Sequence, residues 1–131
     1  MKIIFIIGII VVVLFTVKNW KMNPSMNQID GSDIITVGAL KEKLKNEQPI
    51  MIDVRTPDEF VGKLGHIEGS FLIPLNELPQ RLQELEKYKN EEIIMVCRSG
   101  NRSGQATVFL NNNDFNARNM VGGMIKWNMT K

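Results

Sequence analysis

Short strand-like runs, most of them apolar, limit what this chain can fold into more than any other feature. They lie at residues 50–54, 71–73, 93–96 and 118–121, and patterns of helical periodicity separate them. Strands that are apolar on both faces and alternate with helices are typical of a parallel sheet covered on both sides. We therefore predict an α/β fold of three layers, with a central, mostly parallel sheet flanked by helices.

Local capping signals place helices between these runs. Thr56 is followed by Pro57 at the first helical position and by Glu59, and together they form a capping box. Asn76 begins an amphipathic pattern with leucines on one face. Helices are predicted over residues 36–46, from residue 56, from residue 76, over residues 103–112 and after residue 123.

The beginning of the chain differs from the rest because it contains a long apolar stretch without charge. Residues 3–17 have no charged side chain, Lys2 and Lys18 flank them, and Trp20 follows. A helix over residues 1–20 would span about 30 Å, which is the thickness of the hydrocarbon core of a bilayer. A cleavable signal peptide is the alternative, but no small-residue cleavage site follows the apolar stretch.

We accordingly predict three segments: a transmembrane anchor formed by one N-terminal helix over residues 1–21, a linker over residues 22–32, and one α/β domain over residues 33–131. The predicted localisation is a membrane, which the chain contacts through residues 1–21. The domain is expected on the cytoplasmic face, because the cysteine chemistry considered below suits a reducing compartment.

The balance of charge argues against a nucleic-acid partner. The chain has 16 basic and 14 acidic residues, a net charge of +2. Lys2, Lys18 and Lys21 belong to the predicted anchor, so the remainder is nearly neutral. It shows no basic stripe with interleaved aromatic residues, and we predict no nucleic-acid binding.

Cys97, the one cysteine, directly follows the most strand-like run of the chain. In parallel α/β sheets, ligands bind at the carboxyl ends of strands, and a loop of small residues there can point backbone N–H groups into one concavity. We predict that Cys97 is catalytic and that the residues after it form an anion-binding loop. These residues are Arg98, Ser99, Gly100, Asn101, Arg102 and Ser103.

The surroundings of Cys97 favour its thiolate form. The loop amides, the N-terminus of the next helix and the two arginines all stabilise negative charge, so we expect its pKa to lie below that of an ordinary cysteine. A buried, inert cysteine is the alternative at such a position. A single cysteine also excludes an intramolecular disulfide and a Cys-rich metal site, and we expect neither a metal nor a cofactor.

Several short motifs occur in a fixed order around this loop, and the chain resembles the rhodanese-like sulfurtransferase family in them. The resemblance covers about residues 33–129. The motifs are Asp53-Val54-Arg55, Glu59-Phe60, Gly65-His66-Ile67-Glu68-Gly69-Ser70, Ile73-Pro74, the loop from Cys97 to Arg102, and Gly122-Gly123 with Trp127.

The resemblance implies an enzyme of the thiosulfate sulfurtransferase class with a single catalytic domain. Cys97 would take sulfane sulfur from a small anionic donor such as thiosulfate, hold it as a persulfide, and pass it to cyanide or a thiol. Arg102 would close the loop and Arg98 would attract the anion. Asp53 and Arg55 would support the loop rather than take part in the chemistry.

Two other functions stay open from the sequence. Cysteine phosphatases share the thiolate and its cradle, but they place one residue more between cysteine and arginine than the four that separate Cys97 from Arg102. A non-enzymatic persulfide carrier, or a membrane-tethered interaction module, would keep the same loop without turnover.

His66, the only histidine, is interpreted as a hydrogen-bonded residue of a turn and not as a general base.

Overall fold

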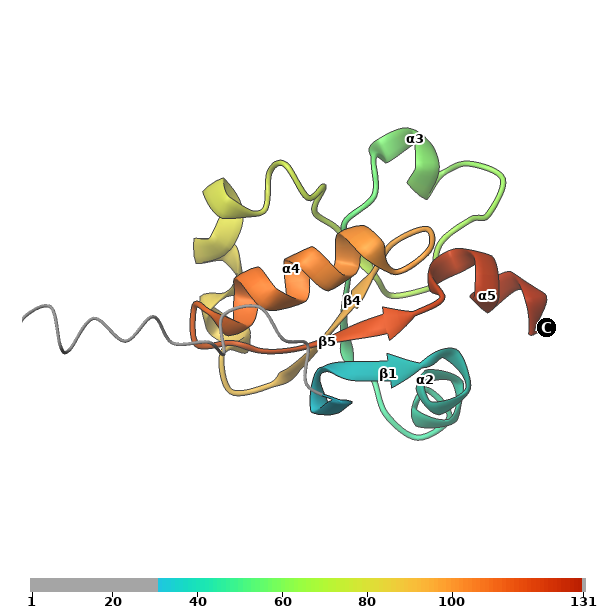
Figure 1. Ribbon diagram of the computed structural model, residues 1–131, viewed down its shortest axis with the longest axis horizontal. Helices are drawn as coiled ribbons and strands as arrows, with labels where there is room; N and C mark the ends of the chain where they lie inside the picture. Colours follow the sequence, from blue (N-terminus) through green and yellow to red (C-terminus); the bar gives the residue numbers. More distant parts are fainter. Residues whose placement is uncertain (1–30, 131) are drawn as a thin grey trace, which may run out of the picture.

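A parallel sheet of five strands lies at the centre of the protein in the computed structural model, which describes residues 31–130 (Figure 1). The order of the strands in the sheet is β1-β5-β4-β2-β3. The elements in chain order are η2 (Gly31–Asp33), β1 (Ile34–Thr36), α2 (Val37–Lys43), β2 (Ile50–Asp53), α3 (Pro57–Phe60), β3 (Phe71–Leu72), η3 (Pro79–Tyr88), β4 (Glu92–Val96), α4 (Asn101–Asn111), β5 (Asn116–Val121) and α5 (Gly123–Met129).

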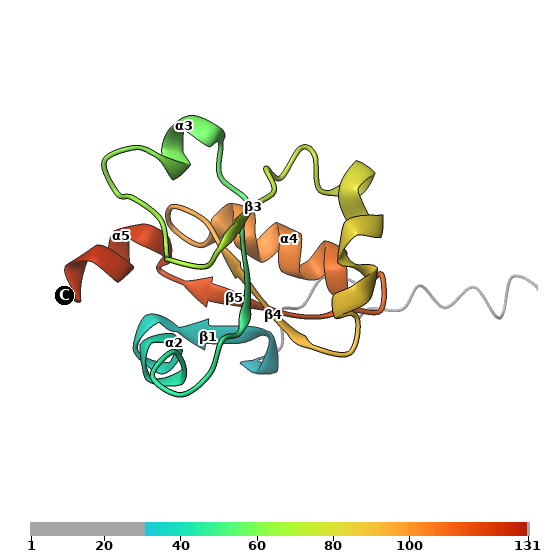
Figure 2. The ribbon, with the colours of Figure 1, turned by 180° about the vertical axis from the view of Figure 1, so that it is seen from behind.

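All strand pairs are parallel, so the strands point toward one edge of the sheet. β4 lies in the middle, between β5 and β2, and Val96 at its end is paired with Asp53. The loop between β4 and α4 therefore begins beside the end of β2. The helices α3 and α5 also lie at this edge, as both ribbon views show (Figures 1 and 2).

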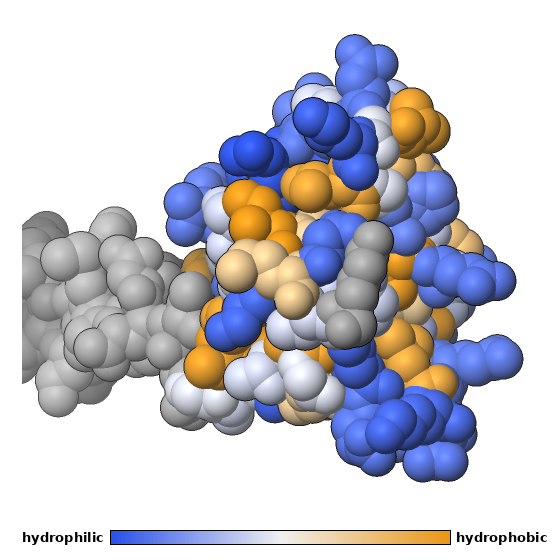
Figure 3. Space-filling view, turned by 90° about the vertical axis from the view of Figure 1, so that its right-hand side faces the viewer, coloured by the Kyte–Doolittle hydropathy of each residue, from blue (hydrophilic) through white to orange (hydrophobic). Residues whose placement is uncertain are grey.

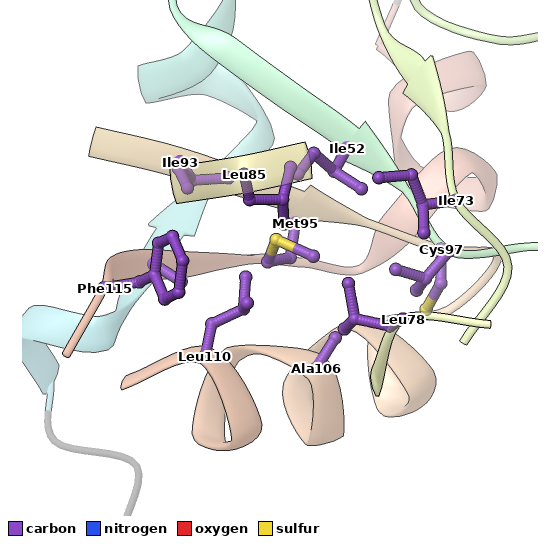
Figure 4. Close-up of a cluster of buried hydrophobic side chains, with 12 residues drawn as sticks. Ile52, Ile73, Leu78, Leu85, Ile93, Met95, Cys97, Ala106, Leu110 and Phe115 are labelled. Carbon is purple, nitrogen blue, oxygen red and sulfur yellow. The ribbon is translucent and has the colours of Figure 1, made fainter. Parts of the chain in front are cut away.

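Helices cover both faces of the sheet and bury a hydrophobic cluster on each. On one face, η3 and α4 contribute Leu85 and Leu110 to a cluster that reaches Cys97 (Figure 4). On the other face, α2 and α5 contribute Leu40 and Met124. Alternate residues of β4 enter the two clusters, which is why this strand is apolar along its whole length. The predicted three-layer fold with a parallel sheet is confirmed.

The predicted capping signals are present at two helices. The Thr36 side chain accepts a hydrogen bond from the Ala39 N–H at 3.1 Å and caps α2. Thr56 and Glu59 form the reciprocal bonds of a capping box at α3. These local signals fix where each helix leaves the carboxyl edge of the sheet.

Two elements differ in type from the predictions. β1 was not predicted, because it has three residues and runs directly into the cap of α2, which leaves no room for a strand pattern. The segment after Asn76 forms the 3-10 helix η3 and not an α-helix. Residues three apart share a face in a 3-10 helix, so Leu82 and Leu85 both pack toward the cluster that holds Cys97.

The predicted membrane localisation requires a correction. Within residues 31–130, no helix has both the length and the apolar character needed to cross a bilayer. This finding overturns the predicted localisation and, with it, the placement of the domain on a cytoplasmic face. The helix predicted over residues 1–21 lies outside the described residues, as does most of the linker predicted over residues 22–32.

Candidate active site

The loop that follows β4 turns back on itself around the sulfur of Cys97. The thiol is 1% exposed, and its Sγ accepts a hydrogen bond from the Gly100 N–H at 3.0 Å. Gly100 has a φ of 106° and is the N-cap of α4. A side chain at this position would be strained, because L residues rarely adopt that backbone conformation. α4 consequently begins at Asn101, two residues before the predicted start at Ser103.

The Ser103 hydroxyl is the second donor at the sulfur. Its Oγ lies 3.1 Å from Cys97 Sγ and is fully buried in the first turn of α4. Burial raises the pKa of the Cys97 thiol, but hydrogen bonds from the Ser103 hydroxyl and from the backbone N–H groups of the loop outweigh it and lower the pKa. The expected shift toward the thiolate is therefore present, and hydrogen bonds decide its direction.

The N-terminus of α5 orients the backbone of the loop. The N–H groups of Met124 and Ile125 donate to the carbonyl oxygens of Cys97 and Arg98 at 2.9 and 3.0 Å. These carbonyls face α5, so successive N–H groups can face the sulfur instead. Gly123, with a φ of 57°, makes this approach possible, because a Cβ there would lie 2.4 Å from the Arg98 carbonyl carbon.

Arg102 is paired with a glutamate that the sequence analysis did not place at the site. Its guanidinium donates to both carboxylate oxygens of Glu59 at 2.7 Å, which joins α4 to α3. This bidentate hydrogen bond holds the pKa of Glu59 at about 2 against the opposing effect of burial. Glu59 belongs to a motif in the sequence, but only the fold shows which residue it contacts.

Asp53 and Arg55 form a buried ion pair at the end of β2. Arg55 Nε lies 2.9 Å from Asp53 Oδ1, and Nη2 lies 2.7 Å from Oδ2. Arg55 also donates to the backbone carbonyls of Glu59 at 3.2 Å and Gly65 at 2.7 Å. The pair thus fixes the end of the strand to α3 and to the loop after it, and no hydrogen bond within residues 31–130 joins either side chain to Cys97.

Arg98 is exposed and lines a pocket of about 360 Å³ beside the loop. The other charged residues of this pocket are Arg55, Asp58, Glu59 and Lys63. Because Arg55 and Glu59 are engaged in ion pairs, Arg98 and Lys63 are the basic groups that can meet an incoming anion. Figure 3 shows the molecule from the side toward which β1 and β5 point in Figure 1, where hydrophilic and hydrophobic side chains are mixed over the surface.

The remaining predicted loop residues, Ser99 and Asn101, are exposed and border a second pocket of about 620 Å³ between α4 and β5. Asn119 of β5 also lines that pocket, is 5% exposed, and accepts a hydrogen bond from Ser103. Asn119 is not among the residues predicted at the site. Its signal would have been a polar residue between Ala117 and Val121, the apolar residues that share its face of the strand, which predicts a specific hydrogen bond.

His66 lies in the loop after α3. Its Nδ1 is 2.8 Å from the Phe60 carbonyl oxygen, and its ring is stacked on that of Phe60 at 3.7 Å. This geometry fits the hydrogen-bonded turn residue that the sequence indicated. Among the described residues there is no cluster of three or more side chains able to hold a metal ion.

A buried thiol that receives hydrogen bonds in a loop at the carboxyl edge of a parallel sheet places the protein among α/β proteins that carry a cysteine at the end of a central strand. Within that class, the sequence matches the family described as Rhodanese-like domain over residues 36–130. The protein belongs to the rhodanese-like domain family, which confirms the resemblance found in the sequence.

Relatives of similar length agree with this assignment. A crystal structure of a rhodanese-like domain protein from Staphylococcus aureus is 36% identical, with a TM-score of 0.66 over 72% of this chain and 90% of that one. A sulfurtransferase from Allochromatium vinosum is 31% identical over 104 residues, 78% of this chain and 88% of that protein. The tRNA uridine(34) hydroxylase of Buchnera aphidicola is 34% identical over 89 residues, 64% of this chain, but the alignment spans only 28% of that protein.

Proposed function

We propose that the protein is a sulfurtransferase that carries sulfur as a persulfide on Cys97, with thiosulfate as donor and cyanide or a thiol as acceptor. The observation that carries the proposal is the pair of donors at the sulfur, the Gly100 N–H at 3.0 Å and the Ser103 hydroxyl at 3.1 Å. Both stabilise negative charge on Sγ, and the relative of similar length from Allochromatium vinosum is named a sulfurtransferase.

In the first step the Cys97 thiolate attacks the outer sulfur of thiosulfate. A bond forms between Sγ and that sulfur, the bond to the sulfite sulfur breaks, and sulfite leaves with the electron pair. The negative charge then lies on the outer sulfur of the persulfide. Backbone N–H groups of the loop, fixed in advance by α4 and α5, stabilise this charge in the way that an oxyanion hole stabilises oxygen.

In the second step the acceptor attacks the outer sulfur. With cyanide the products are thiocyanate and the Cys97 thiolate, and with a thiolate acceptor they are the acceptor persulfide and the Cys97 thiolate. The leaving group is Sγ in both cases, so the donors that lower the pKa of Cys97 also stabilise the charge that returns to it. Neither step needs a general base once the thiolate has formed.

The charges around the loop favour an anionic donor. Arg98 and Lys63 line the pocket beside the cysteine loop, where their charge raises the local concentration of a divalent anion. Arg102 is held by Glu59, so its role in this proposal is to close the loop and not to bind the donor directly. Asp53 and Arg55 support the same arrangement from the end of β2.

The length of the loop separates sulfur transfer from phosphate ester hydrolysis. Four residues lie between Cys97 and Arg102, one fewer than in cysteine phosphatases. A shorter loop encloses a smaller space, which suits a single sulfur atom better than a phosphoryl group with its oxygens. We therefore place phosphatase activity outside the proposed function.

A steady-state assay with thiosulfate and cyanide tests the proposal, with formation of thiocyanate as the signal. We expect turnover by the wild type and only the uncatalysed rate for Cys97→Ser. The exposed substitution Gln83→Ala, on η3, serves as the matched control and keeps full activity. Equal rates for wild type and Cys97→Ser would contradict the enzymatic proposal.

A persulfide carrier is the second candidate function, because a carrier needs the same stabilised sulfur. Intact-protein mass spectrometry after treatment with thiosulfate distinguishes the two. A gain of one sulfur atom without steady-state turnover supports the carrier, and the same gain together with steady-state formation of thiocyanate supports the enzyme. Absence of added sulfur on the wild type would exclude both.

A further inference from the structure

We propose that Asn119 is a positioning residue that controls the direction of the Ser103 hydroxyl proton and thereby how readily Cys97 ionises. This inference deepens the proposed function by adding a residue of β5 to the site. It rests on the proposed function only where the persulfide is concerned, because ionisation of the thiol can be measured without any sulfur transfer.

A closed ring of hydrogen bonds joins Cys97, Gly100, Asn119 and Ser103. Cys97 Sγ accepts from the Gly100 N–H, and the Gly100 carbonyl accepts from Asn119 Nδ2 at 3.0 Å. Asn119 Oδ1 lies 2.6 Å from Ser103 Oγ, which lies 3.1 Å from Cys97 Sγ. Asn119 and Ser103 are 5% and 0% exposed, so the bond between them and the bond from Ser103 to the sulfur are buried.

The orientation of the Asn119 amide follows from its partners. The Gly100 carbonyl can only accept, so the amide nitrogen must face it and Oδ1 must face Ser103. Oδ1 can also only accept. The Ser103 hydroxyl therefore has two acceptors, Asn119 Oδ1 and the Cys97 sulfur, and a single proton to give.

This competition couples Asn119 to the ionisation of Cys97. When Cys97 is a thiol, its proton can point to Ser103 Oγ while Ser103 donates to Asn119. When Cys97 is a thiolate, Ser103 must turn its proton to the sulfur, and Asn119 Oδ1 loses its donor in a buried site. Asn119 thus opposes formation of the thiolate, while Ser103 favours it.

The persulfide restores the first arrangement. Its Sγ is a neutral divalent sulfur and a weak acceptor, so the Ser103 proton turns back to Asn119. It returns to Sγ as the acceptor removes the outer sulfur and charge develops on the leaving thiolate. The hydroxyl rotates without any net transfer of a proton.

The charged side chains near the ring do not take over the hydrogen bonds of Ser103 or Asn119. Arg102 interacts electrostatically with Cys97 and Asp53, but its hydrogen bonds go to Glu59. Asp53 is bound by Arg55. Arg98, exposed in the loop, is the other charged neighbour in sequence. Within residues 31–130, none of these side chains forms a hydrogen bond with Ser103 or Asn119.

The test is the pH profile of Cys97 alkylation by iodoacetamide, measured in the full chain. Ser103→Ala should raise the midpoint of the profile by about one pH unit, because a hydrogen bond to a charged group is lost. Asn119→Ala should lower the midpoint by roughly half a unit or more. In the Ser103→Ala background, Asn119→Ala should shift the midpoint much less, because the hydroxyl for which Asn119 and the sulfur compete is absent and only the bond to the Gly100 carbonyl is lost.

Asn111→Ala is the matched control. Asn111 also joins α4 to β5, through bonds of 2.7 and 3.0 Å to the Ala117 backbone, but it does not contact Ser103. It should lower the melting temperature and leave the midpoint unchanged. The proposal is overturned if Asn119→Ala shifts the midpoint upward or not at all, if it shifts it equally without Ser103, or if Asn111→Ala shifts it as Asn119→Ala does.

If Asn119→Ala does not fold, Asn119→Asp provides the same cycle with nearly the same side-chain volume. A carboxylate is a stronger acceptor, so the midpoint should rise, and it should rise more with Ser103 present than with Ser103→Ala. An equal rise in both backgrounds would overturn the proposal. Because alkylation requires no sulfur donor, a protein inactive toward thiosulfate would still give this result, and the two proposals can fail separately.

Discussion

The ion pair between Glu59 and Arg102 makes a quantitative prediction for Glu59→Gln. The pKa of Glu59 is about 2 against an ordinary value of 4.5, a difference of 2.5 units. At about 1.36 kcal/mol per unit, the upper limit for its contribution to the free energy of unfolding is about 3.4 kcal/mol. The two side chains are 28% and 34% exposed, so screening by water reduces the expected loss in Glu59→Gln to roughly 1–2 kcal/mol.

The same pair predicts a pH dependence. Folding lowers the pKa of the Glu59 carboxyl group, so its ionised form stabilises the folded state. The contribution of Glu59 is therefore complete above about pH 4.5. It decreases as the pH falls and is lost below about pH 2. Glutamine at position 59 can retain the backbone bond of the capping box, so the substitution removes the charge and leaves the helix cap.

Urea unfolding of wild type and Glu59→Gln, followed by tryptophan fluorescence at several pH values, measures this effect. The difference in the free energy of unfolding should be largest near neutral pH and should shrink steadily in acid. Glu84→Gln is the charge-matched control, because Glu84 pairs with Arg81 at 2.8 Å on the exposed side of η3. A difference that is constant with pH, or as large for Glu84→Gln as for Glu59→Gln, would refute the reasoning.

Three further changes test other parts of the site and the core. Gly123→Ala places a Cβ 2.4 Å from the Arg98 carbonyl in a left-handed backbone. We expect a loss of about 1–3 kcal/mol of stability in thermal unfolding and a fall in kcat/KM in the thiocyanate assay. Arg98→Ala should raise the KM for thiosulfate several-fold with little change in kcat, an effect that weakens with added salt when kinetics are compared at two ionic strengths. Leu110→Ala, at a position with no exposed surface, should cost about 2–5 kcal/mol in urea unfolding without altering the alkylation profile of the cysteine.

The parts of the fold that the sequence predicts are those whose signals are local. β2 and β4 are continuous apolar runs, α3 has its capping box in four consecutive residues, and the loop after Cys97 is contiguous. In each case the residues that interact are neighbours in the chain. β1 is too short to carry such a pattern and becomes a strand because β5 offers it a partner.

The contacts that complete the site are between distant residues. Glu59 and Arg102 are 43 positions apart, and Ser103 and Asn119 are 16 apart. Which of them meet depends on the order of strands in the sheet, where β5 lies beside β4. A single sequence shows that a buried asparagine needs a partner, but not that the partner stands next to the cysteine.

The contact between the N-terminus of α5 and the loop after Cys97 has a consequence for the order in which the domain can assemble. A chain emerging from the ribosome produces β4 and Cys97 before the strand and helix that complete their surroundings. Until residues 122–125 are available, the carbonyls of Cys97 and Arg98 lack the N–H groups that hold them. The thiol can therefore acquire its final reactivity only when the C-terminal helix has docked, so a chain truncated after Val121 would contain every residue of the loop and still lack the bonds that shape it.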